Sequence, residues 1–177
     1  MEQRSENSYD PAKDLGATVR FLNGIQEKMV KMVQHLDTQT NILIGISSAV
    51  FIFSISKFQG DNPETALIIT GFASAFSALI GLLAIHPPRF MRKKGQKESL
   101  MYNRKISGFP SPSEYENELA QAAGNRGKII EEYSLEIYNL ARYYYRPKRE
   151  LFKIARSVLF AGLFAGLAVF LVKILLN

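Results

Sequence analysis

Two places along the chain combine a cation with an aromatic ring. The first cluster contains Tyr102, Arg104 and Lys105, and the second contains Arg142, Tyr143 and Arg146 together with Tyr144 and Tyr145. An aromatic ring can stack on a planar base, and a lysine or arginine can pair with a phosphate, so each cluster could bind a nucleotide. The three consecutive tyrosines could also form an aromatic belt at a membrane surface, and this interpretation is favoured by the residues alone.

The usual catalytic and metal-binding patterns are missing from the sequence. There are no cysteines, which excludes thiolate zinc sites and a cysteine nucleophile. His35 and His86 are the only imidazoles, so a histidine-based metal site is not expected. Gly127-Lys128 suggests a phosphate-binding loop, but its leading glycine and its hydroxyl residue are both replaced. We therefore predict that the protein is not an enzyme and has no catalytic residues, metal or cofactor.

Three uncharged, apolar stretches divide the chain, at residues 38–56, 65–85 and 157–172. A helix needs about 20 mostly apolar residues to cross a bilayer. The second stretch has this length. The first is marginal, because it begins with four polar residues. The third reaches about 20 residues only if the Lys173 side chain extends to the membrane interface, so that the apolar residues after it can be counted. Three buried core helices are the alternative, but so short a chain could not cover them. We predict an all-α membrane protein with three transmembrane helices and cytoplasmic helical extensions that form a bundle.

The distribution of lysine and arginine predicts how the chain is oriented in the membrane. Five cations precede the first span, one lies between the first two spans, and fifteen lie in residues 86–156 together with eight acids. We expect residues 86–156 and the N-terminus to be cytoplasmic, and the C-terminus to lie outside, in the bacterial inner membrane. No cleavable signal peptide is expected, so the first span would act as its own insertion signal.

Both cytoplasmic parts show helical patterns. Apolar residues at steps of three and four between Leu15 and Leu36 predict an amphipathic helix that could run unbroken into the first span. A second helix should begin at Ser111 as its cap and be interrupted at Gly124–Gly127, and Pro147 should break or kink the chain before the third span. We expect the two extensions to pair, although a helix on the membrane surface is the alternative for the first.

The predicted organisation is residues 1–37 as an N-terminal cytoplasmic amphipathic helix, 38–85 as transmembrane helices one and two, 86–156 as a basic cytoplasmic region with a long helix, and 157–177 as the third transmembrane helix.

Several further positions invite two interpretations. Asp37 could be a carboxylate at the water boundary, like an N-cap, or an interhelical partner of an arginine such as Arg156. Five cations between Arg89 and Lys97 indicate topology and attraction to anionic lipid, and an anion site is the alternative. Small residues four apart predict close helix packing and, more weakly, oligomerisation. These small residues are Gly71, Ala75, Gly162 and Gly166.

The order of several short motifs resembles the membrane effectors of Pycsar antiphage systems. The stretch from Leu36 to Ile46 is similar to the family pattern A-D-x-K-A-s-x-L-L-G-I at the start of the first span. The other similar motifs, in order, are Pro88-Arg89, Tyr102, Ser113-Glu114-Tyr115 and the stretch from Ile137 to Arg142. The resemblance covers residues 25–176. Gln39 replaces the usual lysine, and Pro147 to Arg149 stand where the family lacks such an interruption.

This resemblance implies an effector that senses a cyclic pyrimidine mononucleotide, cUMP or cCMP, made by a partner pyrimidine cyclase. Such an effector impairs inner-membrane integrity and arrests growth of the infected cell, which is abortive infection. We also expect a homo-oligomer in contact with the lipid bilayer and no nucleic-acid partner. The alternatives are a membrane effector triggered by another second messenger or partner, and a membrane scaffold or accessory subunit that binds no ligand.

The charge asymmetry makes the topology testable with reporters that work only outside the cytoplasm. Such a reporter should be active after Asn177 and inactive when inserted near Gly108, because the cations between the second and third spans are retained inside. Insertion between residues 58 and 63 is the matched positive control. Equal activity after Asn177 and near Gly108 would remove the third span from this topology.

Overall fold

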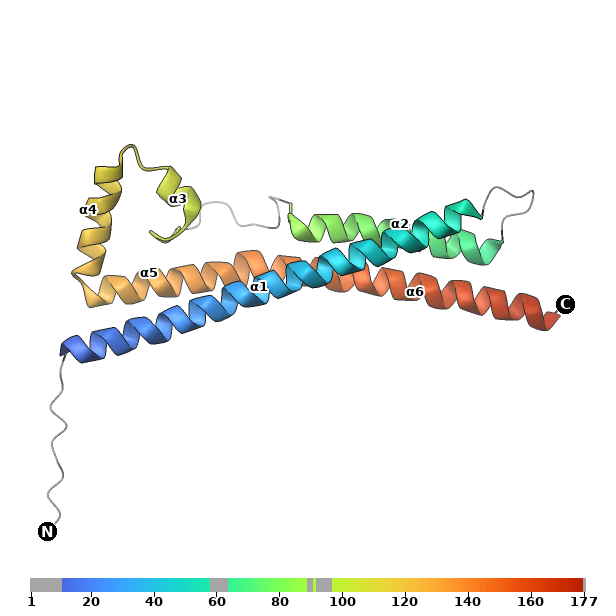
Figure 1. Cartoon of the computed structure of the whole chain (residues 1–177), viewed down its shortest axis with the longest axis horizontal. Helices are drawn as coiled ribbons and strands as arrows, with labels where there is room; N and C mark the ends of the chain where they lie inside the picture. The colour runs from blue at the N-terminus through green and yellow to red at the C-terminus, as the bar shows by residue number, and fades with distance from the viewer. Residues whose placement is uncertain (1–10, 58–63, 89–90, 92–96, 177) are drawn as a thin grey trace, which may run out of the picture. The chain divides into compact units, whose positions relative to one another are not determined.

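The computed structural model describes residues 11–57, 64–88, 91 and 97–176, and within these ranges the chain is mostly helical, with short turns and loops and no strand (Figure 1). The elements are α1 (Pro11–Ser56), α2 (Thr65–Ile85), α3 (Asn103–Ser107), α4 (Pro112–Ala123), α5 (Arg126–Asn139), the π-helix η2 (Leu140–Tyr145) and α6 (Arg146–Leu176). Three helical stretches are long and apolar enough to cross a membrane: Leu15–Ser56, Thr65–Ile85 and Arg126–Leu176. The predicted all-α membrane fold with three spanning helices is therefore confirmed.

The chain divides into two compact units. The extension unit comprises Met1–Lys31 and Gly95–Ala141, and the span unit comprises Met32–Lys94 and Arg142–Asn177. Helix α1 is continuous through Lys31 and Met32, so the predicted unbroken run into the first span is confirmed. Within the extension unit, Arg126 at the start of α5 donates a hydrogen bond to the Thr18 hydroxyl of α1 at 3.5 Å.

The local start and stop signals of the extension unit act as the sequence predicts. The Ser111 hydroxyl accepts a hydrogen bond from the backbone N–H of Glu114 at 3.3 Å, and Pro112 is the first residue of α4. At the predicted interruption, the side-chain oxygen of Asn125 accepts bonds from the N–H groups of Gly127 and Lys128, at 2.9 and 3.2 Å. These caps satisfy donors that have no partner inside a helix, which explains why α4 ends and α5 begins here.

Of the break or kink predicted at Pro147, the break does not occur, and the kink stays a prediction. Helix α6 begins at Arg146, directly after η2, and it contains Pro147 as its second residue. A proline has no N–H for an α-helical hydrogen bond, and its ring crowds the carbonyl four residues earlier. The π-helical residues before it use a different hydrogen-bonding partner, so the helix passes Pro147 by changing type instead of ending.

In the span unit, α2 and α6 are antiparallel and pack closely through the glycines of α6. A Cβ atom built on Gly162 would lie 2.0 Å from the Cβ of Ala73, and one built on Gly166 would lie 2.2 Å from the Thr70 hydroxyl. Both separations are far below van der Waals contact, so only glycine allows this approach. Gly71 is buried in α2 and Ala75 is half-buried, while a role of these four residues in oligomerisation stays a prediction.

Serine hydroxyls connect all three spanning helices. The hydroxyls of Ser47 in α1 and Ser77 in α2 lie 3.0 Å apart, and Ser77 also donates to the carbonyl oxygen of Ala155 in α6 at 2.9 Å. Because Ser77 uses its hydrogen on that carbonyl, Ser47 is the donor between the two hydroxyls. Next to this chain lies an apolar core made of Leu43, Ala155 and Leu159, with Ile80, Phe152 and Leu163 packed against it.

The outward faces of the spanning helices carry large apolar side chains that the protein itself does not cover. The most exposed of these in α1, α2 and α6 include Ile42, Ile52, Phe53, Phe72, Phe76, Leu79, Phe160 and Phe164. Small and hydroxyl side chains point inward and large apolar ones outward, which is the reverse of a soluble bundle. This arrangement fits a lipid surrounding, where packing and hydrogen bonds hold the helices together.

The contact at Gly162 and Gly166 predicts that even a methyl group is disruptive. Gly162→Ala or Gly166→Ala should lower the free energy of unfolding in detergent by about 1–3 kcal/mol, because the nearest atoms belong to short side chains that cannot move away. Gly45→Ala is the matched control, since a Cβ there meets nothing within 4 Å. Denaturant titration of the purified variants measures the difference, and equal stability of all three variants would contradict the packing described here.

Candidate functional site

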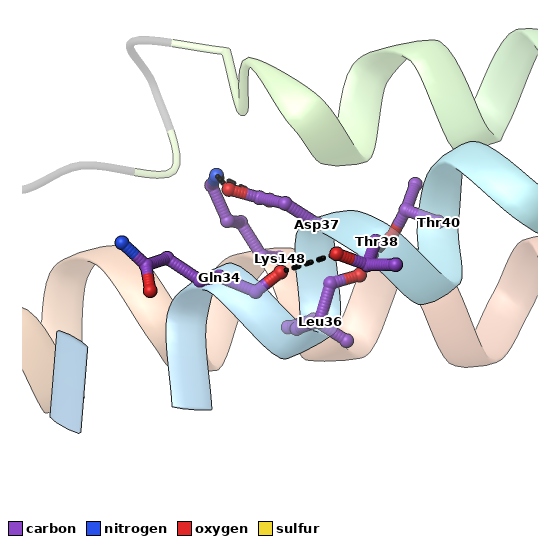
Figure 2. Close-up of polar contacts among 6 residues, drawn as sticks. All are labelled: Gln34, Leu36, Asp37, Thr38, Thr40 and Lys148. Carbon is purple, nitrogen blue, oxygen red and sulfur yellow. Dashed lines mark hydrogen bonds and ion pairs between the residues drawn. The ribbon is translucent and has the colours of Figure 1, made fainter. Parts of the chain in front are cut away.

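An ion pair joins α1 and α6 at one end of the span unit. The ammonium nitrogen of Lys148 lies 2.6 and 2.8 Å from the two carboxylate oxygens of Asp37, so it donates to both (Figure 2). The Lys148 side chain is only 11% exposed and that of Asp37 is 35% exposed. A cation buried to this extent needs a partner, because an unpaired charge at low dielectric is strongly disfavoured.

The residues of α1 on either side of Asp37 are buried or hydrogen-bonded within the helix. Leu36 is buried beside Asp37, and the Thr40 hydroxyl donates to the Leu36 carbonyl oxygen at 2.8 Å. The Thr38 hydroxyl donates to the Gln34 carbonyl oxygen at 3.1 Å, as Figure 2 shows. Both hydroxyls therefore have hydrogen-bonding partners within their own helix. The polar residues at the start of the first span thus need no water molecules as partners.

Of the two interpretations of Asp37, the interhelical partner is correct, but the predicted cation is wrong. Asp37 cannot be a cap, since α1 is continuous on both sides of it. Its partner is Lys148, which the sequence analysis had not singled out. The guanidinium of Arg156 instead lies over the Phe152 ring, 5.9 Å from its centroid. Arg156 is exposed, and the helix turn places it about a quarter of a turn away from the buried residues Lys148 and Ala155.

The cluster of Arg142, Tyr143 and Arg146 lies at the foot of α6. Arg142 and Tyr143 belong to η2, and Arg146 begins α6. Both arginines are exposed, the three tyrosines are half-buried, and neither arginine takes part in an ion pair among the described residues. A half-buried ring and two exposed guanidinium groups thus lie within five consecutive residues of one helical stretch, and π-helical turns are frequent at functional sites.

The cluster of Tyr102, Arg104 and Lys105 lies in the extension unit, at the short helix α3. Tyr102 precedes α3 as its N-cap residue. Arg104 is 3.7 Å from the carboxylate of Glu98, and Lys105 is half-buried. The charge of Arg104 is thus partly balanced within the protein, which makes this cluster a weaker anion site than the one at the foot of α6.

An acidic face of α5 holds the chain that precedes α3, and the sequence analysis missed it. Ser99 donates to the carboxylate of Glu136, and both residues are buried. The backbone N–H of Leu100 donates to Glu132 at 2.6 Å. These are carboxylates at helical spacing, which from sequence alone look like an ordinary solvent-facing stripe.

Lys97 and Glu131 add an exposed ion pair to the same docked chain. The hydrogen bond from Lys97 lowers the pKa of Glu131, and the same bond raises the pKa of Lys97. Because the pKa of Glu131 is lowered and that of Lys97 is raised, both side chains stay charged at neutral pH, and the pair weakens only when Glu131 is protonated in acid or Lys97 is deprotonated in strong base. The other four cations of the run from Arg89 to Lys97 lie outside the described residues, so the two interpretations of that run stay predictions.

If Asp37 and Lys148 stabilise the protein through their mutual attraction, exchanging the two residues should restore stability that single substitutions remove. Asp37→Asn or Lys148→Met should destabilise the protein by about 1–3 kcal/mol, less than for a fully buried pair because Asp37 is one-third exposed. The exchanged double variant, Asp37→Lys with Lys148→Asp, should regain much of the loss. Glu131→Gln, in an exposed pair, is the control and should change stability little. Strictly additive losses in the exchanged variant would show that the two charges do not interact.

Comparison with known protein families identifies a relationship that covers most of the chain. The family model for the Pycsar effector protein domain matches residues 21–175. Comparisons with curated proteins and with solved structures found no match. The matched region contains all three spanning helices except for the ends of the first and third, the Asp37–Lys148 pair and both aromatic–cation clusters. The chain therefore belongs to the Pycsar effector family, as the motifs indicate, and is a membrane effector of antiphage defence.

Proposed function

We propose that the protein senses a cyclic pyrimidine mononucleotide, cUMP or cCMP, made by a partner pyrimidine cyclase. In response it impairs the integrity of the bacterial inner membrane and arrests growth of the infected cell. It acts by binding and rearrangement, not as an enzyme, and it does so as a homo-oligomer with the N-terminus inside and the C-terminus outside. Family membership supports this class of function.

The observation that carries the proposal is the position of the second aromatic–cation cluster. A cyclic mononucleotide has one negative phosphate and one planar base, so its site needs a cation and a stacking face. Arg142, Tyr143 and Arg146 supply both, and they adjoin the buried Lys148 that ties α6 to α1. The other cluster, at Tyr102, has the same residue types, but Glu98 competes for Arg104.

The π-helical turn offers a route from binding to the membrane spans. A π-helix holds more residues per turn than an α-helix, so conversion between the two shifts the helical register at the foot of α6. A ligand that binds one of these forms more tightly will increase its population. Since Lys148 follows the turn by only three residues, such a shift would act on its bond to Asp37. Loosening of that pair is how we expect the signal to reach the spans.

Removal of either arginine tests the site. Arg142→Ala or Arg146→Ala should weaken cUMP or cCMP binding by about 1.5–3 kcal/mol, the typical value for a lost charge-assisted hydrogen bond. Arg146→Lys should lose less, because it keeps the charge. Calorimetry on detergent-purified full-length protein measures the affinities, and Arg20→Ala is the matched control, since Arg20 bonds only within α1 among the described residues.

The outcomes separate this site from the alternatives. Wild-type affinity in both alanine variants would place the nucleotide at Tyr102 to Lys105 or at a subunit interface. No binding of any cyclic mononucleotide by the wild-type protein, with binding of another second messenger, would replace the proposed ligand. Constitutive co-purification with a partner protein, without ligand-dependent depolarisation of vesicles, would favour a scaffold.

A further inference from the structure

Five cations form one stripe along the outward face of α6 and its foot. They are Arg142, Arg146, Arg149, Lys153 and Arg156. They follow one another at steps of four, three, four and three residues, which keeps them on one side of a helix. All five are exposed, whereas the buried residues of α6 near them, such as Lys148 and Ala155, lie on another side of the helix, about a third of a turn away. Among the described residues, Lys153 is the only one of the five with an acidic partner, Glu150 at 3.8 Å.

The helix register places the last part of this stripe beside apolar surface. Gly162 faces Ala73 across the antiparallel contact of α2 and α6. Each residue further along α2 therefore corresponds to one residue earlier on α6, so Leu79 lies level with Arg156 and Leu82 lies level with Lys153. Both leucines are more than half exposed. At one depth, then, the span unit presents leucines on α2 and cations on α6.

This register gives the two helices unequal apolar lengths. Helix α2 is apolar over its 21 residues, about 31 Å, which matches the hydrocarbon core of a bilayer. The uncharged part of α6 from residue 157 to 172 covers only about 24 Å. The difference lies entirely at the Asp37–Lys148 end, because at the other end Lys173 of α6 bonds to Glu64 at the start of α2, at 3.2 Å.

The cations must therefore meet something polar at a depth where α2 meets hydrocarbon. Two features favour lipid headgroups over a water-filled path between subunits. The same face of α6 continues directly into Phe160 and Phe164, both exposed, which would make a poor lining for an aqueous path. Arginine and lysine also pair well with phosphate, and they can extend along apolar surface toward the headgroups.

We propose that Arg149, Lys153 and Arg156 bind the phosphates of anionic phospholipids in the leaflet at the Asp37–Lys148 end, and draw that leaflet inward beside α6. The bilayer is then locally thinner along α6 than along α2, an accommodation expected where an apolar stretch is shorter than the hydrocarbon core. This inference rests on the span unit alone. It depends neither on nucleotide sensing nor on which end faces the cytoplasm.

The absence of tryptophan allows a clean measurement. Phe160→Trp puts a single reporter one turn after Arg156 on the stripe face, and Phe76→Trp puts one at a similar depth on α2. Full-length protein reconstituted in vesicles is quenched with brominated phosphatidylglycerol or brominated phosphatidylcholine. We expect phosphatidylglycerol to be preferred at Phe160→Trp by roughly fivefold or more, since each cation near an anionic surface favours it. No such preference is expected at Phe76→Trp.

Charge variants of the Phe160→Trp protein identify the residues responsible. Arg149→Gln, Lys153→Gln and Arg156→Gln together should abolish the preference, whereas Arg149→Lys and Arg156→Lys together should keep it. The matched control removes three exposed cations of α1, with Arg20→Gln, Lys28→Gln and Lys31→Gln, and should leave the preference unchanged. The comparison of the two tryptophan positions needs no charge variant, so it stands even if the triple variant fails to insert.

Three results would overturn the proposal. Equal preference at the two tryptophan positions would mean that the stripe has no specific effect on lipid. Loss of the preference on adding inorganic phosphate at constant ionic strength would show that the cations bind a free anion. Quenching at Phe160→Trp by neither lipid would place this face against a second copy of the chain or along an aqueous path.

Discussion

The contact between α2 and α6 at Gly162 and Gly166 is the constraint on which the span unit depends. The two helices approach so closely that an added methyl group would fall inside the radius of a neighbouring atom. In lipid there is little hydrophobic gain from bringing apolar helices together, so this close packing has to supply the association. It also sets the register that brings Ser77 to the Ala155 carbonyl oxygen and Lys173 to Glu64.

The features that depend on local signals were predictable from the sequence. Uncharged length predicts the three spans, the side chain of Ser111 predicts the start of α4, and the glycines around Asn125 predict the interruption before α5. Each of these follows from residues a few positions apart. The break that was one of two outcomes predicted for Pro147 on the same local basis does not occur, because here the chain passes the proline through a π-helical turn and stays helical.

The features that depend on register were not predictable. Asp37 and Lys148 are 111 residues apart, and nothing near Lys148 distinguishes it from Arg149 or Lys153. Only the rotation of α6 turns Lys148 inward and the next cations outward. The same holds for Glu132 and Glu136, whose spacing resembles a solvent-facing stripe until the chain at Ser99 and Leu100 is docked on them.

Helix α6 carries cations in two different environments, one nearly buried and the others exposed. The inward lysine is nearly buried and has a fixed carboxylate partner, so its removal leaves Asp37 uncompensated. The outward cations are exposed, and their energetics depend on what the surroundings supply. A change of helical register at the foot of α6 would exchange these environments, turning the lysine toward lipid or water and an arginine toward Asp37. The charges of Asp37 and Lys148 therefore balance each other only at the present rotation of α6. A rotation of α6 that starts at η2 would separate them and cost free energy, unless a ligand stabilised the rotated form.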